Sequence, residues 1–395
     1  MKPIPFLNGI RGIAAIMVVF AHIGCFWGEV CVDVFFVLSS FLLTTNLYER
    51  YLQYIKAQRT LFDWFIMLVV YFIKRFARIY PLLIALGLYL ATLVPEVREK
   101  AYHIPKDYAF SLWNMIRFDT KFFVLWTLPV EFHYYMIIPL IVFAYTITPS
   151  KYLRWAGLTY IVYRSVLDGF NAPVLRRAFY PFQHHQWVFL VGSVIAFLYV
   201  DLQASFDFSK LNKSIKAKLD TLSTILVIYI VMIAWNSDLF AFLFWKEKPH
   251  GFYYPYSAWA ISLVILKEAL IPGDVADFFS ANFFQFLGKI SFSIYLLHAF
   301  PLRMWTPGSL PIKEVCFVPF MTIMISIPSF YLIEKPCIDA TNHFCKHLQE
   351  SLEQGTSQRM YLYKVWDYLE SRPWYQKLRL YTRVKSTSEE NDKIV

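Results

Sequence analysis

The chain has 395 residues, of which 57% are hydrophobic, 19% aromatic and only 17% charged. Its apolar residues fall in long runs instead of amphipathic stripes, which excludes an ordinary soluble domain and predicts an all-α, polytopic, integral membrane protein. The formal net charge of +10 does not predict nucleic-acid binding, because the basic residues gather between apolar runs, where they set topology in the bilayer.

The apolar runs predict about ten membrane-spanning helices, with an interfacial helix before the third. They cover residues 10–28, 32–47, 79–95, 126–147, 154–168, 186–201, 221–240, 256–271, 284–305 and 315–333. Residues 61–78 are apolar and then abruptly basic, which is typical of a helix lying at the inner membrane surface. Lysines and arginines, Arg50 and Lys74 among them, concentrate in the loops on one side, which predicts that both termini are cytoplasmic.

We expect residues 1–337 to form one membrane domain and residues 338–395 a cytoplasmic tail. The tail predicts a membrane-skimming helix and a disordered end after Ser386. Four of its apolar residues have helical spacing: Leu362, Val365, Trp366 and Leu369. Five cysteines give no disulfide framework, so we expect free thiols, with pairing among Cys25, Cys31 and Cys316 on the outer side as the alternative. No metal site is expected.

The first span, within LNGIRGIAAIMVVFAHIGCFW at residues 7–27, contains an arginine and a histidine. At about 100° and 1.5 Å per residue, Arg11 and His22 lie on nearly the same helix face, roughly 16 Å apart along the axis. Ionisable groups at membrane depth cost at least a few kcal/mol each, so they usually face a cavity or a partner. His22 could be a structural histidine that bonds to a neighbouring helix, or it could form a functional pair with Arg11. Because the two residues share a helix face, we give both interpretations equal weight.

The second span begins CVDVFFVLSSFLL and places Asp33 ahead of a polar pair, Ser39 and Ser40. Asp33 suits an N-terminal cap at the outer boundary, which this stretch alone favours over a catalytic role.

The stretch LWTLPVEFHYYMIIPLI contains Glu131. Pro129 fits a first helical turn, and a carboxylate at Glu131 then suits the helix dipole. We favour a polar cavity wall, because the same turns hold four further hydrogen-bonding side chains: Trp126, His133, Tyr134 and Tyr135.

Two further segments carry polar groups. The stretch GKISFSIYLLHAF places five polar residues along one span, and a packing role is favoured for its serines. The five are Lys289, Ser291, Ser293, Tyr295 and His298. In KRFARIYP, Arg75 and Arg78 are three apart and share a helix face at the cytoplasmic boundary. Snorkelling to lipid phosphate is one role for them; bidentate binding of a soluble polyphosphate uses the same geometry.

Six elements in this order resemble the signatures of the acyltransferase type 3 family, integral membrane enzymes that O-acylate glycans and antibiotics. They are LNGIRGIAAIMVVFAHI, VDVFFVLSSFLL, KRFARIYPL, LWTLPVEFHYY, FLGKISFSIYLLH and YLIEKP. The resemblance covers about residues 4–337. It implies transfer of an acyl group, often acetyl, from cytosolic acyl-CoA as co-substrate, with no tightly bound cofactor, to a hydroxyl on the far side of the membrane.

The resemblance also implies roles for individual residues. His22 is expected to be the catalytic base, Arg11 its partner or a coenzyme contact, and Glu131 the acidic member of the catalytic site. Arg75 and Arg78 match a basic pair near the third span where coenzyme phosphates are thought to bind. A neutral imidazole can take the proton of an attacking hydroxyl, which is otherwise a weak nucleophile.

The expected substrate cavity draws on several of the polar positions: Asp33, Ser39, Trp126, Tyr134 and His298. Asp33 and Ser39 match the family element DxFFxxSG, but Ser40 replaces its glycine, which puts close backbone packing there in question. The acceptor is expected to be a glycan, a lipid-linked sugar or a small hydroxylated metabolite. A multispan transporter with an intramembrane His/Arg/Glu site is the alternative, against which stands the absence of an internal repeat.

Overall fold

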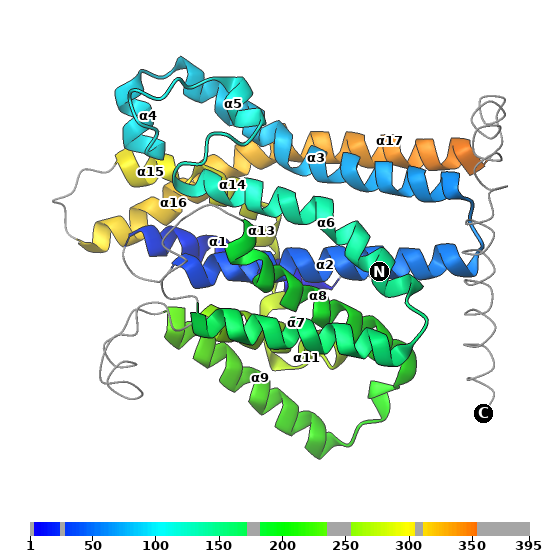
Figure 1. Cartoon of the computed structure of the whole chain (residues 1–395). Coiled ribbons are helices and arrows are strands. Elements are labelled where there is room, and N and C mark those ends of the chain that lie inside the picture. The colour runs from blue at the N-terminus through cyan, green and yellow to red at the C-terminus, as the bar shows by residue number, and fades with distance from the viewer. Residues whose placement is uncertain (1–3, 24–27, 172–181, 235–253, 305–310, 354–395) are drawn as a thin grey trace, which may run out of the picture.

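The computed structural model describes residues 4–23, 28–171, 182–234, 254–304 and 311–353, and it confirms an all-α fold across them (Figure 1). The elements of the first half are α1 (Pro5–His22), α2 (Gly28–Lys56), α3 (Leu61–Thr92), α4 (Pro95–Tyr102), α5 (Leu112–Ile116), the 3-10 turn η1 (Phe123–Trp126), α6 (Thr127–Ile147) and α7 (Lys151–Asn171). Those of the second half are α8 (Phe182–Ser205), η3 (Phe208–Lys210), α9 (Lys213–Ala234), α11 (Tyr254–Leu270), α12 (Asp274–Ser280), α13 (Asn282–Lys289), α14 (Ser291–Leu297), α15 (Ala299–Met304), α16 (Pro311–Ser329), the π-helical turn η4 (Phe330–Glu334) and α17 (Lys335–Glu353).

Several helices are long and apolar enough to cross a membrane, as expected of a multi-pass membrane protein. Among the described residues there are six such segments, or seven if α13 and the helix after it, bent by 55°, form one broken span. The six are Pro5–His22, Val30–Lys56, Phe123–Ile147, His185–Ser205, Lys213–Ala234 and Cys316–Glu350. The count of about ten therefore stays a prediction; its remaining spans fall on α3, α7 and α11.

The interfacial helix expected over residues 61–78 is not confirmed, because that segment is the first half of one helix, α3. Thr60 and Asp63 form a capping box at its start, and the helix continues through Pro81 to Thr92. In Figure 1, α3 (blue) and α17 (orange) run side by side, and the two helices are in contact. The basic segment of α3 therefore packs against α17 inside the protein, and α3 is not divided into an interfacial helix and a separate span.

The C-terminal helices α16, η4 and α17 follow one another without a break, so the boundary expected after residue 337 lies inside the first turn of α17. The expected tail helix at residues 362–369 and the end after Ser386 lie outside the described residues. The thiols of Cys316, Cys337 and Cys345 form no disulfide within the described residues, and Cys25 lies outside them.

Glycines bring α1 against α12 and α13. A Cβ on Gly12 would lie 2.5 Å from the backbone nitrogen of Gly288, and one on Gly9 would lie 1.9 Å from the carbonyl oxygen of Phe279. Because no side chain separates the backbones at these points, the contact fixes the rotation of α1 about its own axis. The direction of Arg11, which lies between the two glycines, is fixed with it.

Helix α2 packs closely on α8, and Ser40 lies at that contact. Its hydroxyl donates to the Val37 carbonyl at 2.9 Å, and a Cβ on Gly192 would lie only 1.9 Å from the same hydroxyl. Close packing therefore survives the replacement of the family's glycine by Ser40, because α8 supplies a glycine opposite it.

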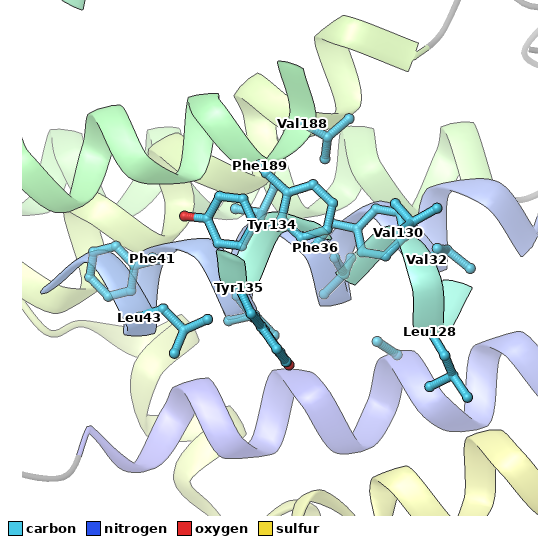
Figure 2. Packing of buried hydrophobic residues seen from close by; sticks show 14 of the residues in the cluster. Val32, Phe36, Phe41, Leu43, Leu128, Val130, Tyr134, Tyr135, Val188 and Phe189 are labelled. Atoms are coloured by element: carbon cyan, nitrogen blue, oxygen red, sulfur yellow. The ribbon is translucent and has the colours of Figure 1, made fainter. Parts of the chain in front are cut away.

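Stacked rings join α2, α6 and α8 in the core. The ring of Phe189 lies 4.5 Å from Phe36 and 4.5 Å from Tyr134, centroid to centroid. Figure 2 shows these three rings in one row, with Tyr135 directed away from it. Neighbouring residues of α6 thus serve two purposes: Tyr134 packs in the core, and Tyr135 lines the cavity described next.

Candidate active site

A cavity of about 430 Å³ is lined by residues of α1, α2, α3, α6 and α14. Five cations line it, all of them half-buried: Arg11, Arg50, Lys74, Arg75 and Arg78. Glu131 is the one carboxylate among the described lining residues. The cavity is therefore strongly electropositive and suits an anionic ligand.

The five cations have no ion-pair partner within 4 Å among the described residues, whose ion pairs lie elsewhere in the molecule. The Nε of Arg75 is buried and lacks a hydrogen-bond partner in this part of the chain. A buried donor without an acceptor costs about 1–3 kcal/mol, more when it is charged. A bound anion would supply the missing acceptors and offset the repulsion among the cations.

Glu131 is held by hydroxyl groups. Pro129 and Glu131 lie in the first turns of α6, as the sequence predicts. The Ser39 hydroxyl on α2 donates to Oε1 of Glu131 at 2.7 Å, and the Tyr135 hydroxyl donates to the same oxygen. Arg11 is an electrostatic neighbour of this carboxylate. The arrangement fixes one negative charge beside Arg11. The other four cations of the cavity stay available to bind an anionic ligand.

A second cluster forms around His22 at the end of α1. The ring of His22 stacks on that of His298 with centroids 5.1 Å apart, and Phe123 contacts both rings, at 4.6 Å and 5.7 Å. Nδ1 of His298 lies 2.8 Å from the Tyr295 carbonyl oxygen, which only accepts, so Nδ1 carries a proton. Nε2 of His298 is buried without a hydrogen-bond partner among the described residues, whereas His22 is an exposed residue.

Helix α14 connects the cavity to this histidine pair. Ser291 and Tyr295 line the cavity, and His298 follows directly after the helix. The Tyr295 hydroxyl accepts from Thr127 at 3.0 Å and donates to the Val124 carbonyl at 3.2 Å, which ties α14 to the start of α6. His22 itself does not line the cavity; α1 is one helix from Arg11 to His22, a rise of roughly 16 Å.

Four residues expected to line the substrate cavity lie outside its lining: Asp33, Tyr134, Trp126 and His298, the last of which belongs to the histidine pair. Asp33 is buried within α2, which starts at Gly28, and accepts a hydrogen bond from Ser257 at 3.3 Å. The interpretation of Asp33 as an N-terminal cap is therefore wrong, because the helix begins more than a turn earlier. Tyr134 bonds to Thr44 and Ser193 in the core.

The third of these residues, Trp126, packs its ring against two neighbours. The ring centroids lie 5.0 Å from His185 and 6.4 Å from Phe36. These contacts place Trp126 in the aromatic packing between α2, η1 and α8.

Arg50 and Lys74 are the site residues that sequence reasoning missed, because it assigned them to the topological charge pattern. Lys74 lies four residues before Arg78 and so shares its face of α3. Arg50 lies eleven residues after Ser39 on α2, the same spacing that relates Arg11 to His22. Helical spacing from the residues already identified was the signal that would have found both.

Comparison with known proteins identifies relatives along almost the whole chain. Residues 4–334 match the family model described as "Acyltransferase domain". The chain is 25% identical over 370 residues to the "Putative O-acetyltransferase SACOL0978" of Staphylococcus aureus (strain COL), covering 85% of this chain and 57% of that protein. It is 24% identical over 369 residues to "O-acetyltransferase OatA" of Staphylococcus aureus (strain NCTC 8325 / PS 47), with 84% and 57% covered. The chain thus spans little more than half the length of these relatives, and no solved structure matches it.

Proposed function

Because the chain belongs to the acyltransferase family, we propose that it transfers an acyl group, acetyl in the simplest case, from acyl-CoA to a hydroxyl group of its acceptor. One observation carries the choice of donor: five cations face a single cavity with one carboxylate among them and no ion-pair partner in the described structure. Coenzyme A bears a diphosphate and a separate phosphate monoester. Arginine forks bind phosphate oxygens in pairs, so the lining suits this molecule.

In this proposal the coenzyme phosphates bind at Arg75 and Arg78, where the orphaned Nε of Arg75 gains an acceptor. Arg11, next to Glu131, contacts the inner part of the coenzyme. The long pantetheine arm passes Tyr295 and brings the thioester toward His22. With both termini in the cytosol, the cations of α2 and α3 lie toward the cytosolic surface, which is where acyl-CoA is supplied.

The chemical step takes place at the histidine pair. His22 removes the proton of the acceptor hydroxyl as the oxygen attacks the thioester carbonyl. The C–S bond then breaks, and the coenzyme thiolate takes the proton from the imidazolium of His22, which leaves an ester and free coenzyme A. The acceptor hydroxyl lies at the edge of the stacked His22–His298 pair, and the buried Nε2 of His298 is available to accept a hydrogen bond from a second hydroxyl of the acceptor.

The acceptor we propose is a hydroxyl of a glycan, a lipid-linked sugar or a small metabolite. The name of the relative OatA says only that it is an O-acetyltransferase, so it does not identify the acceptor. Mass spectrometry of glycans and polar metabolites from cells with and without the protein would identify the acceptor by an acyl mass difference.

Calorimetric titration of the purified protein in nanodiscs with coenzyme A tests the proposed donor site. We expect saturable binding that weakens at least about tenfold in Arg75→Gln/Arg78→Gln, since each charge-assisted contact contributes about 1.5–3 kcal/mol. Arg117→Gln is the matched control, because Arg117 pairs with Asp119 at the surface and does not line the cavity. Absence of binding to the folded wild-type protein, or unchanged binding in the double variant, would contradict the proposal.

A further inference from the structure

We propose that Arg50 and Lys74 form a second phosphate subsite in the same cavity, and that it binds a phosphate monoester. In the proposed donor this group is the 3′-phosphate of the coenzyme ribose. This subsite rests on the proposed acyl-CoA donor, and it gives a ligand-binding role to two cations whose positions in the sequence indicate only membrane topology.

The cations of the cavity divide into two groups. Arg11 has Arg78, Glu131, Tyr135 and Arg75 as its electrostatic neighbours, and these form the inner group. Lys74 has Arg50, Cys345 and Arg75 as its neighbours, so Lys74 and Arg50 form an outer group that Arg75 connects to the inner one.

Helix geometry separates the two groups along the cavity. Arg50 lies eleven residues beyond Ser39 on α2, roughly 16 Å along the helix axis from the residue that holds Glu131. Lys74 lies about one turn, roughly 6 Å, before Arg78 on α3. The lining between Ser39 and Arg50 continues through Leu43 and Asn46, so one elongated space joins both groups. A ligand with phosphates at two separate positions matches this layout better than a single compact anion.

No carboxylate among the described residues neutralises the positive charge of the outer group, so a bound anion can do so. Neither Arg50 nor Lys74 forms an ion pair within the described residues, and Glu131, the lining carboxylate, lies at the inner group. Where α17 packs on α3, the neighbour that it presents to Lys74 is the fully buried thiol of Cys345. A phosphate monoester carries nearly two negative charges at neutral pH, which suits two adjacent cations.

Paired titrations with coenzyme A and 3′-dephospho-coenzyme A, in nanodiscs of phosphatidylcholine alone, test the subsite. We expect the wild-type protein to bind coenzyme A at least about tenfold more tightly than the dephospho form, the ratio that one charge-assisted contact gives. Arg50→Gln and Lys74→Gln should each remove most of this preference and leave the affinity for the dephospho form unchanged. Arg75→Gln should weaken both ligands, and Lys56→Gln, a cation later on α2 that does not line the cavity, should weaken neither.

The outcomes separate this inference from the proposed function. Equal affinity of the wild-type protein for the two ligands would overturn the subsite and leave the donor proposal standing, whereas binding of neither would overturn both. The phosphate monoester of an anionic lipid has the same chemistry, so the titrations are repeated with phosphatidic acid in the nanodisc. If Arg50→Gln abolishes phosphatidic acid binding while the preference for coenzyme A persists, the two cations bind lipid, and the assignment to the donor is overturned.

Discussion

The two ring nitrogens of the buried His298 side chain have different environments. Its Nδ1 is committed to the Tyr295 carbonyl at 2.8 Å, while its Nε2 is buried without a partner in the described structure and belongs to a ring stacked on His22. The two nitrogens therefore have separable functions: one fixes the ring, and the other faces the proposed acceptor.

His298→Asn separates these functions, because the asparagine amide keeps a donor near the position of Nδ1 and removes Nε2. We expect a folded protein with unchanged affinity for coenzyme A and an acyl transfer rate at least about tenfold lower, as a lost hydrogen bond to the reacting substrate predicts. Calorimetry and a transfer assay on the same preparation measure the two quantities. A transfer rate equal to that of the wild type would show that Nε2 has no part in acceptor binding.

At the scale of elements, the position of Arg11 depends on the crossing of α1 and α13. Gly12→Ala would place a methyl group 2.5 Å from the Gly288 backbone nitrogen, so the two helices must separate. We expect a loss of about 1–3 kcal/mol in the free energy of unfolding, together with weaker coenzyme A binding as Arg11 moves.

Gly157→Ala is the control for this substitution, because nothing lies within 4 Å of a Cβ at Gly157 on α7. Alanine there should be neutral or gain up to about 1 kcal/mol from its higher helix propensity. Thermal unfolding in detergent compares the two variants. Equal stability of Gly12→Ala and Gly157→Ala would contradict the close crossing.

The elements also show what the sequence could predict and what it could not. Local patterns located the helices, the start of α6 before Glu131 and the shared face of Arg75 and Arg78, because these depend on spacing along one helix. A hydrogen-bond partner of Asp33 lies 224 residues away on α11, and α3 packs against α17 from the far end of the described chain. Contacts of this kind are set by tertiary packing, which no single segment of the sequence specifies.

For the whole molecule, binding of cytosolic acyl-CoA requires the cation cavity to open toward the cytosol, with both termini on that side. The charge pattern of the loops predicts this orientation. Single cysteines introduced at Lys210 and Val395 in a cysteine-free background should therefore resist a membrane-impermeant maleimide in intact cells and react after permeabilisation. Labelling of either position before permeabilisation would place the donor site on the wrong side for cytosolic acyl-CoA.

In the proposed reaction, His22 is the general base that lets a hydroxyl accept the acyl group of acyl-CoA. The most direct test of this role follows labelled acetyl from acetyl-CoA into a hydroxylated acceptor, with purified wild-type protein and His22→Ala in identical nanodiscs. We predict acceptor-dependent transfer by the wild type and a decrease of about 10²- to 10⁴-fold in the variant, the range for losing a general base, with coenzyme A binding retained. Transfer by a folded His22→Ala protein at the wild-type rate, or no transfer by the wild type with any hydroxylated acceptor, would contradict the account.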